Sequence, residues 1–396
     1  MTETRADVVL GDVAHGGWCV ARIDGKVTFV SGGLPGERVD VEITERGKRF
    51  DRGRVARVLE AHDERVPAPC LVAGICGGCD WQHASPALQL ELKRRVVAEQ
   101  LQRLAGLEWG GQVQAVAPLM GWRTRMQYSG TGDGLGLRAR RSHAVVALPD
   151  GGCRIAASQA PAVLGERVEV VDAASGRVVL VDGQVVEGTS SVQERAAGRD
   201  YTVDADGFWQ IHPQAANTLV KAVLDGLEPH AGESAVDLYC GVGLFAGALA
   251  GAGCDVLGVE INKRAVVHAR RNVPEARFEA AAVDRFLQRL PKRADLVVLD
   301  PPRKGAGKRA VQKVASMQPR RVAYVACDPS ALARDLAYFA DAHYRPLHID
   351  AFDLFPQTHH VECVAILAPS TRNLCGSDAD QVSTASGSRL ASAKHP

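Results

Sequence analysis

Hydrophobic and polar positions change their pattern twice along the chain. In residues 1–60, apolar and polar side chains alternate in short runs, as in residues 26–30 and 38–43, with glycine turns between the runs. Alternation with a period of two is typical of strands that bury one face. We therefore expect a small β-barrel in residues 1–60, an architecture that often binds oligonucleotides.

The remaining patterns predict two further domains and a tail. Residues 61–205 hold a group of cysteines, a helical pattern from about residue 86 to 104 and glycine-rich strands, which indicates a central α+β domain. Residues 206–368 alternate strand and helix patterns, as in βαβ units of a parallel, Rossmann-like sheet. Residues 369–396 are rich in Ser, Ala, Gly and Asp, and we expect them to be disordered. The predicted fold class is α/β.

The composition adds a cellular compartment to this picture. The chain has 396 residues, of which 46% are hydrophobic and 23% are charged, as in ordinary globular proteins. Its first residues lack the apolar segment of a secretion signal, and no apolar run approaches membrane-spanning length. We expect a cytoplasmic protein with no membrane partner and no obligate protein partner. Its ten cysteines should then be reduced, metal-bound or catalytic.

Basic residues form two groups although the net charge is only +1. The first group lies within residues 46–57 and the second within residues 123–141. Two interpretations remain open. Both groups can be solvated strand faces, or they can form a basic surface that follows a phosphate backbone.

Reactive side chains follow several of the predicted parallel strands. One strand runs into a glycine turn at Gly241 and Gly243, the next ends at Glu260, and two later strands end at Asp300 and Cys327. The carboxyl ends of parallel strands share one edge of the sheet, where open α/β sheets bind ligands. We expect a nucleotide-like cofactor at this edge, facing a nucleophile.

The glycine turn and Glu260 predict the cofactor site itself. Gly241 and Gly243 allow a ligand to approach the backbone closely, and Glu260 can accept hydrogen bonds from two ribose hydroxyls. Residues 241–246 also satisfy the dinucleotide fingerprint, so a nicotinamide oxidoreductase is a remote alternative. That class of enzyme does not account for Cys327.

Three cysteines, Cys70, Cys76 and Cys79, lie close together, and Cys153 is a more distant fourth candidate ligand. Thiols at such spacing are typical of a metal site. Four thiolates suit either zinc or an iron–sulfur cluster. The spacing lacks both the repeated Cys-x2-Cys of many zinc sites and the Cys-x3-Cys-x2-Cys of radical enzymes. We prefer a closed, structural cluster.

Cys327 is the candidate nucleophile, and Glu362 is the candidate base. C5 of uracil is a poor nucleophile, but addition of a thiolate at C6 would give an enolate whose C5 can attack a sulfonium methyl group. A general base must then remove the C5 proton so that the thiol can leave. Glu362 begins the last predicted strand, and an antiparallel strand there would bring it to the same edge.

Taken together, these motifs resemble the bacterial family of RNA uracil-C5 methyltransferases, specifically the iron–sulfur branch that modifies 23S ribosomal RNA. The resemblance covers about residues 5–368. It implies a TRAM-type RNA-binding barrel in residues 1–60, an iron–sulfur-binding domain in 61–205 and an S-adenosylmethionine-dependent methyltransferase domain in 206–368. Cys327 matches the nucleophile and Glu362 the base. The implied ligands of a [4Fe-4S] cluster are Cys70, Cys76, Cys79 and Cys153. The expected cofactor-binding residues are Gln210, Tyr239, Gly241, Gly243, Leu244, Glu260 and Asp300.

Two positions depart from the family pattern. Leu244 stands where the family has an asparagine, and Ala282 stands where the following strand usually ends in a polar residue, although Asp284 is near. These departures concern the details of cofactor binding and not the reaction.

The resemblance predicts methylation of uridine C5 in RNA, with 23S ribosomal RNA preferred over the T-loop uridine of transfer RNA. Cytosine methylation is disfavoured because no cysteine follows the proline after Asp300. A non-catalytic RNA-binding or assembly protein is disfavoured because Cys327 and Glu362 are both intact.

Overall fold

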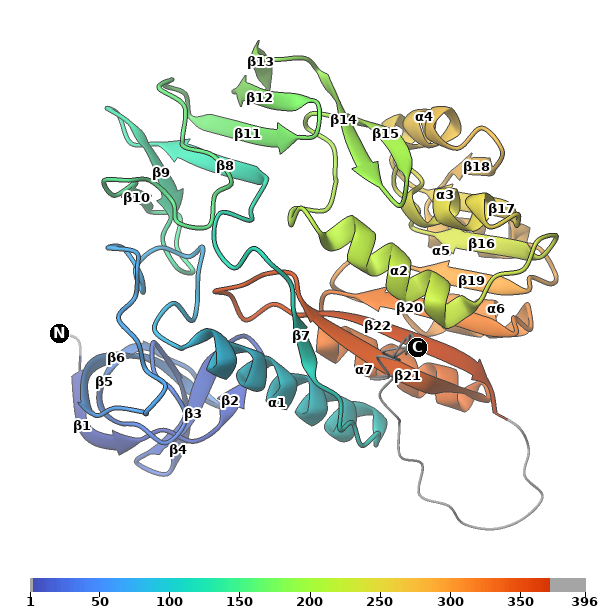
Figure 1. Cartoon of the computed structure of the whole chain (residues 1–396). Coiled ribbons are helices and arrows are strands. Elements are labelled where there is room, and N and C mark those ends of the chain that lie inside the picture. Colours follow the sequence, from blue (N-terminus) through green and yellow to red (C-terminus); the bar gives the residue numbers. More distant parts are fainter. Residues whose placement is uncertain (1–2, 371–396) are drawn as a thin grey trace, which may run out of the picture.

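The computed structural model describes residues 3–370, and Figure 1 shows how three regions of the chain are arranged. We expected the tail to be disordered, but its residues from 371 on lie outside the described part of the chain. None of the helices in residues 3–370 is long and apolar enough to cross a membrane.

The first region is a curved six-stranded sheet at the N-terminal end of the chain. Its strands are β1 (Glu3–Val9), β2 (Val13–Ala14), β3 (Trp18–Ile23), β4 (Lys26–Ser31), β5 (Arg38–Arg46) and β6 (Asp51–Glu60), in the order β1-β5-β6-β4-β3-β2. The alternating pattern has its expected effect, because Val39, Val41 and Ile43 of β5 point into a small core with Cys19 and Ala21 of β3.

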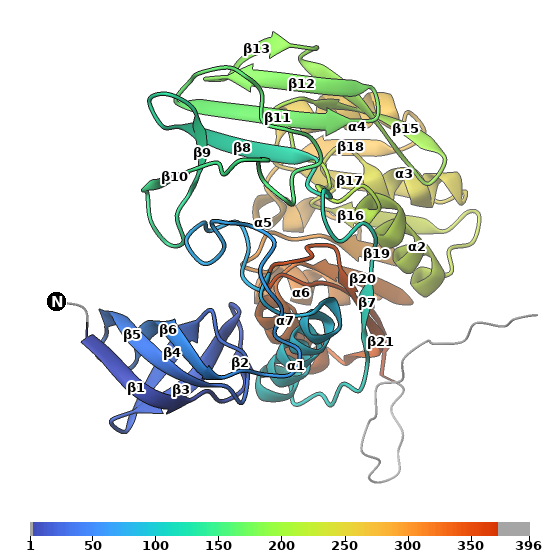
Figure 2. The ribbon, with the colours of Figure 1, turned by 60° about the vertical axis from the view of Figure 1, so that its left-hand side comes forward.

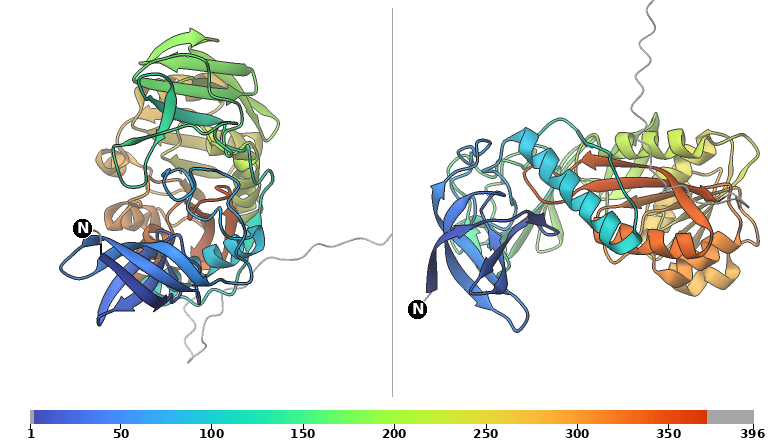
Figure 3. Two further views of the ribbon diagram at one scale, coloured as in Figure 1. Left: turned by 90° about the vertical axis from the view of Figure 1, so that its left-hand side faces the viewer. Right: turned by 90° about the horizontal axis from the view of Figure 1, so that it is seen from below.

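The central region begins with helix α1 (Pro86–Ala105), where the helical pattern predicted it. The Ser85 hydroxyl accepts a hydrogen bond from the N–H of Leu88, Pro86 occupies the first turn, and Gly106 ends the helix in the left-handed conformation. Helix α1 packs against α7 and contacts β2, so it lies between the barrel and the large sheet in the right-hand view of Figure 3.

Antiparallel strands make up the rest of the central region. One sheet has the order β10-β9-β8-β11-β12-β13, and a separate hairpin, β14 and β15, leads into the last region (Figure 2). The bounds of these strands are β8 (Arg125–Gly130), β9 (Leu135–Arg138), β10 (Val145–Ala147), β11 (Arg167–Ala173), β12 (Gly176–Val181), β13 (Gln184–Glu187), β14 (Ser191–Ala196) and β15 (Arg199–Asp204).

The last region contains the large sheet, with the order β18-β17-β16-β19-β20-β22-β21-β7. Every neighbouring pair is parallel except those that include β22, which runs antiparallel to both β20 and β21. The strands are β7 (Val113–Ala115), β16 (Ser234–Leu238), β17 (Asp255–Glu260), β18 (Arg277–Ala280), β19 (Leu296–Leu299), β20 (Arg321–Ala326), β21 (Tyr344–Asp353) and β22 (Glu362–Pro369). The expected parallel sheet with one antiparallel strand is therefore present.

Helices cover both faces of this sheet. Successive strand residues enter opposite cores, as Ala235 and Val236 of β16 do. One core includes α2 (Ala215–Leu227), α3 (Leu244–Gly251) and α4 (Lys263–Asn272). The other includes α1, α5 (Val283–Phe286), η1 (Leu287–Arg289), α6 (Lys308–Ser316) and α7 (Pro329–Asp341). The sheet is thus a three-layer α/β structure whose carboxyl edge stays accessible.

Candidate active site

A cavity of about 1000 Å³ opens at the carboxyl edge of the large sheet. Strand ends and turns that are far apart in sequence meet there because their strands are parallel. Most of the predicted site residues line this cavity: Gln210, Tyr239, Gly241, Glu260, Asp300, Cys327 and Glu362. Gly243 and Leu244 are not among the lining residues.

The glycine turn has the backbone conformation that its sequence predicts. Tyr239, Gly241 and Gly243 all have positive φ values, of 66°, 53° and 93°. Gly243 precedes the first residue of α3, and its missing Cβ would lie 3.2 Å from Val273. Leu244 packs into the core at 8% exposure, and its carbonyl accepts a hydrogen bond from the Tyr201 hydroxyl at 3.2 Å. The turn therefore presents backbone to the cavity while Leu244 points away from it.

Glu260 is held by the backbone on both sides. The N–H of Gly241 donates to its Oε2 at 3.1 Å, and the N–H of Asn262 donates to its Oε1 at 2.7 Å. These contacts join the end of β17 to the glycine turn after β16. The carboxylate is consequently fixed at the cavity wall, with its remaining lone pairs available to a ligand.

Two further carboxyl groups lie beside Glu260. Burial, with the negative charge of Glu260, raises the pKa of Asp300 to about 7. Burial also raises the pKa of Asp237 well above its usual value. Its Oδ2 accepts a hydrogen bond from the N–H of Ala246 at 2.8 Å. Its Oδ1 has no hydrogen-bond partner within the described residues. Glu260 and Asp300 line the cavity, and their carboxyl groups favour a ligand that carries positive charge.

Cys327 directly follows β20, and Glu362 begins β22 beside it. Burial raises the pKa of the Cys327 thiol to about 12, and the carboxyl of Glu362 adds to the effect. Burial likewise raises the pKa of Glu362 well above its usual value, with a contribution from Asp300. In both cases Arg303 is the cation that opposes the shift. The thiol and the carboxyl are thus both held toward their neutral forms in the ligand-free protein.

Arg303 was not a predicted site residue. It lines the cavity at the start of the loop between β19 and α6, together with Lys304, Lys308 and Arg309. Its only sequence signal is its place three residues after Asp300. A cation that follows a strand-ending carboxylate in a parallel sheet necessarily lies near the same edge, and this signal could have found it.

The N-terminal barrel contacts the turn that carries Cys327. Nε2 of His15 lies 3.2 Å from Oδ2 of Asp328, the residue after Cys327. The other carboxylate oxygen of Asp328 caps α7 by accepting the N–H of Ala331 at 2.8 Å. The turn that carries the thiol is therefore fixed from two sides, by α7 and by the barrel.

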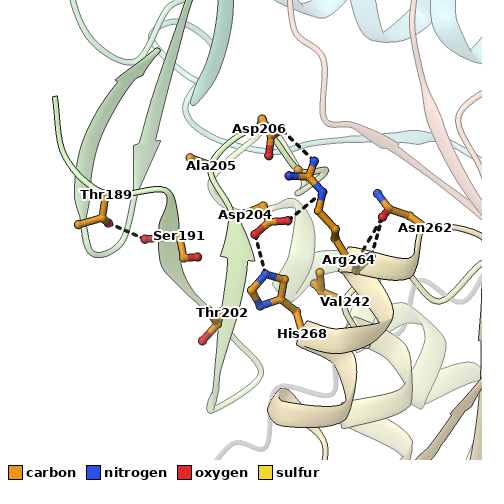
Figure 4. Close-up of polar contacts among 12 residues, drawn as sticks. Thr189, Ser191, Thr202, Asp204, Ala205, Asp206, Val242, Asn262, Arg264 and His268 are labelled. Atoms are coloured by element: carbon orange, nitrogen blue, oxygen red, sulfur yellow. Dashed lines mark hydrogen bonds and ion pairs between the residues drawn. The ribbon is translucent and has the colours of Figure 1, made fainter. Parts of the chain in front are cut away.

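The hairpin β14–β15 closes another side of the cavity. Figure 4 shows Asp204 at the end of β15 bonded to Nε2 of His268 on α4, at 2.7 Å. Arg264, also on α4, adds two further hydrogen bonds. Its guanidinium donates to Asp206 at 2.8 Å, and its backbone N–H donates to Oδ1 of Asn262 at 3.0 Å. Asp204, His268 and Asn262 all line the cavity, so residues of the central region complete its wall.

The four cysteines of the predicted cluster surround a second cavity, of about 490 Å³. Cys70, Cys76, Cys79 and Cys153 all line it, and none of the four forms a disulfide. Within residues 3–370, no three His, Cys, Asp or Glu side chains are arranged to hold a single metal ion. The four cysteines share one cavity, but their side chains are not placed to bind a metal ion together.

Much of the first basic group is ion-paired, although Lys48 and Arg49 form no ion pair within the described residues. Arg52, Arg54 and Arg57 on β6 form ion pairs with Glu45, Glu42 and Asp40 on the adjacent strand β5, respectively. In the second group, Arg140 pairs with Asp80, and Arg125 pairs with Glu194. These contacts favour the interpretation of most of these residues as paired surface and domain-joining cations.

Comparisons with known proteins agree with this geometry. Residues 156–370 match the family model described as tRNA (Uracil-5-)-methyltransferase, and residues 4–56 match the TRAM domain. The chain is 47% identical to an uncharacterized RNA methyltransferase of Streptomyces avermitilis, an alignment that covers 93% of this chain and 99% of the relative. The chain belongs to the uracil-5-methyltransferase family.

Other relatives support the same membership. An uncharacterized RNA methyltransferase of Corynebacterium efficiens is 37% identical, with 92% of this chain and 95% of the relative covered. The structure also superposes on the Pyrococcus abyssi tRNA (uracil-54, C5)-methyltransferase in complex with S-adenosyl-L-homocysteine. The TM-score is 0.71, with 24% identity and coverage of 93% of this chain and 100% of the other. The family is S-adenosylmethionine-dependent and acts on RNA, and both the methyltransferase fold and the N-terminal TRAM domain are confirmed.

Proposed function

We propose that this protein methylates C5 of a uridine in RNA, with Cys327 as nucleophile and Glu362 as general base. The observation that carries the proposal is that both side chains line the same cavity as the glycine turn, Glu260 and Asp300. A thiol and a carboxyl group therefore face one reacting base beside one methyl donor.

The cofactor site fits S-adenosylmethionine. When bound, this cofactor supplies a methyl group on a positively charged sulfonium. The acidic wall formed by Glu260 and Asp300 is complementary to that charge. Gln210 and Tyr239 line the same part of the cavity and would contact the cofactor, whereas Gly243 acts through the shape of the turn and Leu244 through the core.

The protein's own groups carry the proton and electron transfers. Sγ of Cys327, as thiolate, forms a bond to C6 of the uracil, and the C5–C6 electron pair moves to C5 and the O4 enolate. C5 takes the methyl group as the S–CH3 bond of the sulfonium breaks, with that electron pair left on sulfur as a neutral thioether. The carboxylate of Glu362 then removes the C5 proton. The C6–S bond then breaks, the double bond reforms and the thiolate is released. Arg303 favours the ionised forms that Cys327 and Glu362 need for these steps.

We further propose that Cys70, Cys76, Cys79 and Cys153 hold a [4Fe-4S] cluster. The support is that four cysteines, none of which forms a disulfide, line one cavity. Four thiolate ligands suit a [4Fe-4S] cluster, which binds one cysteine at each iron. The cluster would hold together segments that are far apart in sequence.

The proposed target is 23S ribosomal RNA, and the T-loop uridine of transfer RNA is the alternative. The cysteine group favours the ribosomal target, because the family's transfer-RNA branch usually lacks these cysteines. The deciding experiment is mass spectrometry of nucleosides from purified 23S and transfer RNA, in cells with and without the gene. Loss of 5-methyluridine from 23S RNA alone supports the proposal, loss from transfer RNA alone supports the alternative, and loss from neither refutes both.

A further inference from the structure

Residues 303–309, which span part of the loop after β19 and the first two residues of α6, carry four cations at the mouth of the cavity that Cys327 and Glu362 line. Arg303, Lys304, Lys308 and Arg309 all line the cavity, and all four side chains are exposed. Within the described part of the chain, none of them forms an ion pair; Lys308 lies only over the ring of Tyr338, at 6.0 Å. We call residues 303–309 the basic loop.

The basic loop differs from Arg54 and Arg57 of the barrel, because none of its cations forms an ion pair within the described residues. Arg54 and Arg57 each have a carboxylate partner at 2.7–2.9 Å on the neighbouring strand. A phosphate that binds to either arginine must compete with that carboxylate. Lys304, Lys308 and Arg309 need only give up water, so they attract an anion more strongly than Arg54 and Arg57 do.

The loop is also held rigidly. The carboxylate of buried Asp335 accepts the N–H of Ala306 at 2.6 Å and that of Gly307 at 3.1 Å. The hydroxyl of Tyr324 donates to the same carboxylate and accepts the N–H of Ala306 at 3.1 Å. Gly305 has a φ of 85°, and a Cβ there would lie 2.7 Å from Oδ2 of Asp335. The backbone is therefore ordered before any ligand arrives, which reduces the entropy cost of binding.

Asp335 lies on α7, the helix that begins directly after the Cys327 turn. One helix thus fixes both the nucleophile and the basic loop. The cavity has acidic groups at its inner wall and unpaired cations at its mouth. This polarity matches a nucleotide whose base enters the cavity toward a cationic methyl donor while its phosphates stay outside.

We propose that the basic loop is a phosphate-binding element that engages the RNA backbone next to the target uridine, with Asp335 and Tyr324 as positioning residues. This inference rests on the proposed function. It assigns the contact with the RNA phosphates nearest the target uridine to the large domain, and not to the paired arginines of the barrel.

The test compares two double variants of the full chain, Lys304→Ala/Arg309→Ala and, as the control, Arg54→Ala/Arg57→Ala. Both remove two exposed cations, so the change in net charge is the same. The measurement is the affinity for a fluorescein-labelled stem–loop RNA with uridines in its loop, by anisotropy, across a series of KCl concentrations. Circular dichroism checks that both variants are folded.

For the basic-loop variant we expect affinity to fall by about tenfold. The slope of log K against log [salt] should become shallower by about 1.4, because each lost phosphate contact removes about 0.7 from the slope for single-stranded RNA. The control variant should change the slope by less than half as much. An unchanged slope in the basic-loop variant, or equal changes in both variants, would overturn the assignment.

Tyr324→Phe tests the positioning role separately. It keeps all four cations but removes one hydroxyl that holds the loop, so affinity should fall severalfold with no change in the salt slope. A slope change as large as that of the cation variant would refute positioning by Tyr324. Nucleoside analysis of RNA treated with the wild-type protein reports on the proposed function independently. If 5-methyluridine is absent there, the proposed function fails whatever the salt slopes show.

Discussion

Nδ1 of His359 lies 2.6 Å from Oδ2 of Asp80, and the backbone N–H of His359 donates to the same oxygen at 3.0 Å. The two residues are 279 positions apart in sequence. Asp80 directly follows Cys79 of the cysteine group. The ring of His359 lies against that of His360, with centroids 4.1 Å apart, and His360 lines the candidate active-site cavity two residues before Glu362. The contact therefore joins the cysteine-bearing segment to the loop that positions the proposed base.

Asp80→Ala should loosen this loop and displace Glu362. We expect kcat to fall by about ten- to a hundredfold, since small misplacements of a catalytic group have effects of this size. Cofactor affinity should stay within about twofold, because Asp80 lies outside the cofactor site. Steady-state kinetics and calorimetric titration with S-adenosylmethionine measure these two quantities.

Asp7→Ala is the matched control for Asp80, because Asp7 is also an ion-paired aspartate but lies on the exposed face of the barrel, where it pairs with Arg38. Exposed pairs contribute little to stability. Equal losses of kcat in both variants would show that the Asp80–His359 contact has no special role in positioning the base.

Arg303 should control the reactivity of the Cys327 thiol. Burial raises the pKa of this thiol to about 12, so at neutral pH only a small fraction is thiolate, and Arg303 increases that fraction. Alkylation of Cys327 by iodoacetamide should therefore rise with pH from 7 to 9 without a plateau. Arg303→Gln should raise the thiol pKa further and slow alkylation at every pH, whereas Arg303→Lys should restore most of the rate. Peptide mass spectrometry measures modification at Cys327, and an unchanged rate in Arg303→Gln would contradict this role.

Asp300 gives the ligand-free protein a pH-dependent stability. Its pKa is raised from 3.8 to about 7 in the folded state, so the folded state binds more protons than the unfolded state between these values. Its contribution therefore becomes less favourable as pH rises from about 4 to 7. Asp300→Asn removes this titration, so its melting temperature relative to wild type should increase by a few degrees between pH 5 and pH 8. Scanning calorimetry at the two pH values tests this, and a constant difference would contradict the buried-carboxyl account.

The same variant tests the acidic cofactor wall. Asp300→Asn should weaken binding of S-adenosylmethionine more than binding of S-adenosylhomocysteine, because only the first carries a sulfonium charge. We expect a selective loss of about tenfold at pH 8. Equal losses for both molecules would mean that Asp300 contributes shape or hydrogen bonding, and not charge.

Protein purified without oxygen should be brown and contain about four iron and four sulfide per chain, as four cysteine ligands of one cluster require. Cys76→Ser should reduce the iron content and lower the melting temperature. Cys254→Ser is the control, since Cys254 lies outside the cysteine cavity and should leave the iron unchanged. Stoichiometric zinc in colourless wild-type protein would refute the iron–sulfur assignment.

Strand pattern and strand direction predicted much of the site. Glu260, Asp300 and Cys327 lie at the cavity because each ends a strand of one parallel sheet, and Glu362 lies there because β22 is antiparallel. Leu244 follows the same turn but packs into the core, because the first helical turn directs its side chain away from the cavity.

Contacts between distant segments could not be predicted in this way. The Asp80–His359 pair and the buried Lys93–Asp353 pair depend on how α1 and the cysteine segment dock on the large sheet, and no local pattern encodes that docking. The basic run in β6 was ambiguous for the same reason. Its partners, Glu42 and Asp40, become visible only when the register of β5 and β6 is known.

The central claim is that Cys327 bonds to the uracil and that Glu362 resolves the adduct, and Glu362→Gln tests it most directly. The variant is incubated with methyl-labelled S-adenosylmethionine and 23S RNA, and the protein is then separated by denaturing gel electrophoresis. We expect a protein–RNA adduct that carries the labelled methyl group, is absent from Glu362→Gln/Cys327→Ala, and turns over about 10²–10⁴-fold more slowly than wild type. Normal turnover by Glu362→Gln without an adduct, or an adduct that persists when Cys327 is replaced, would contradict the account.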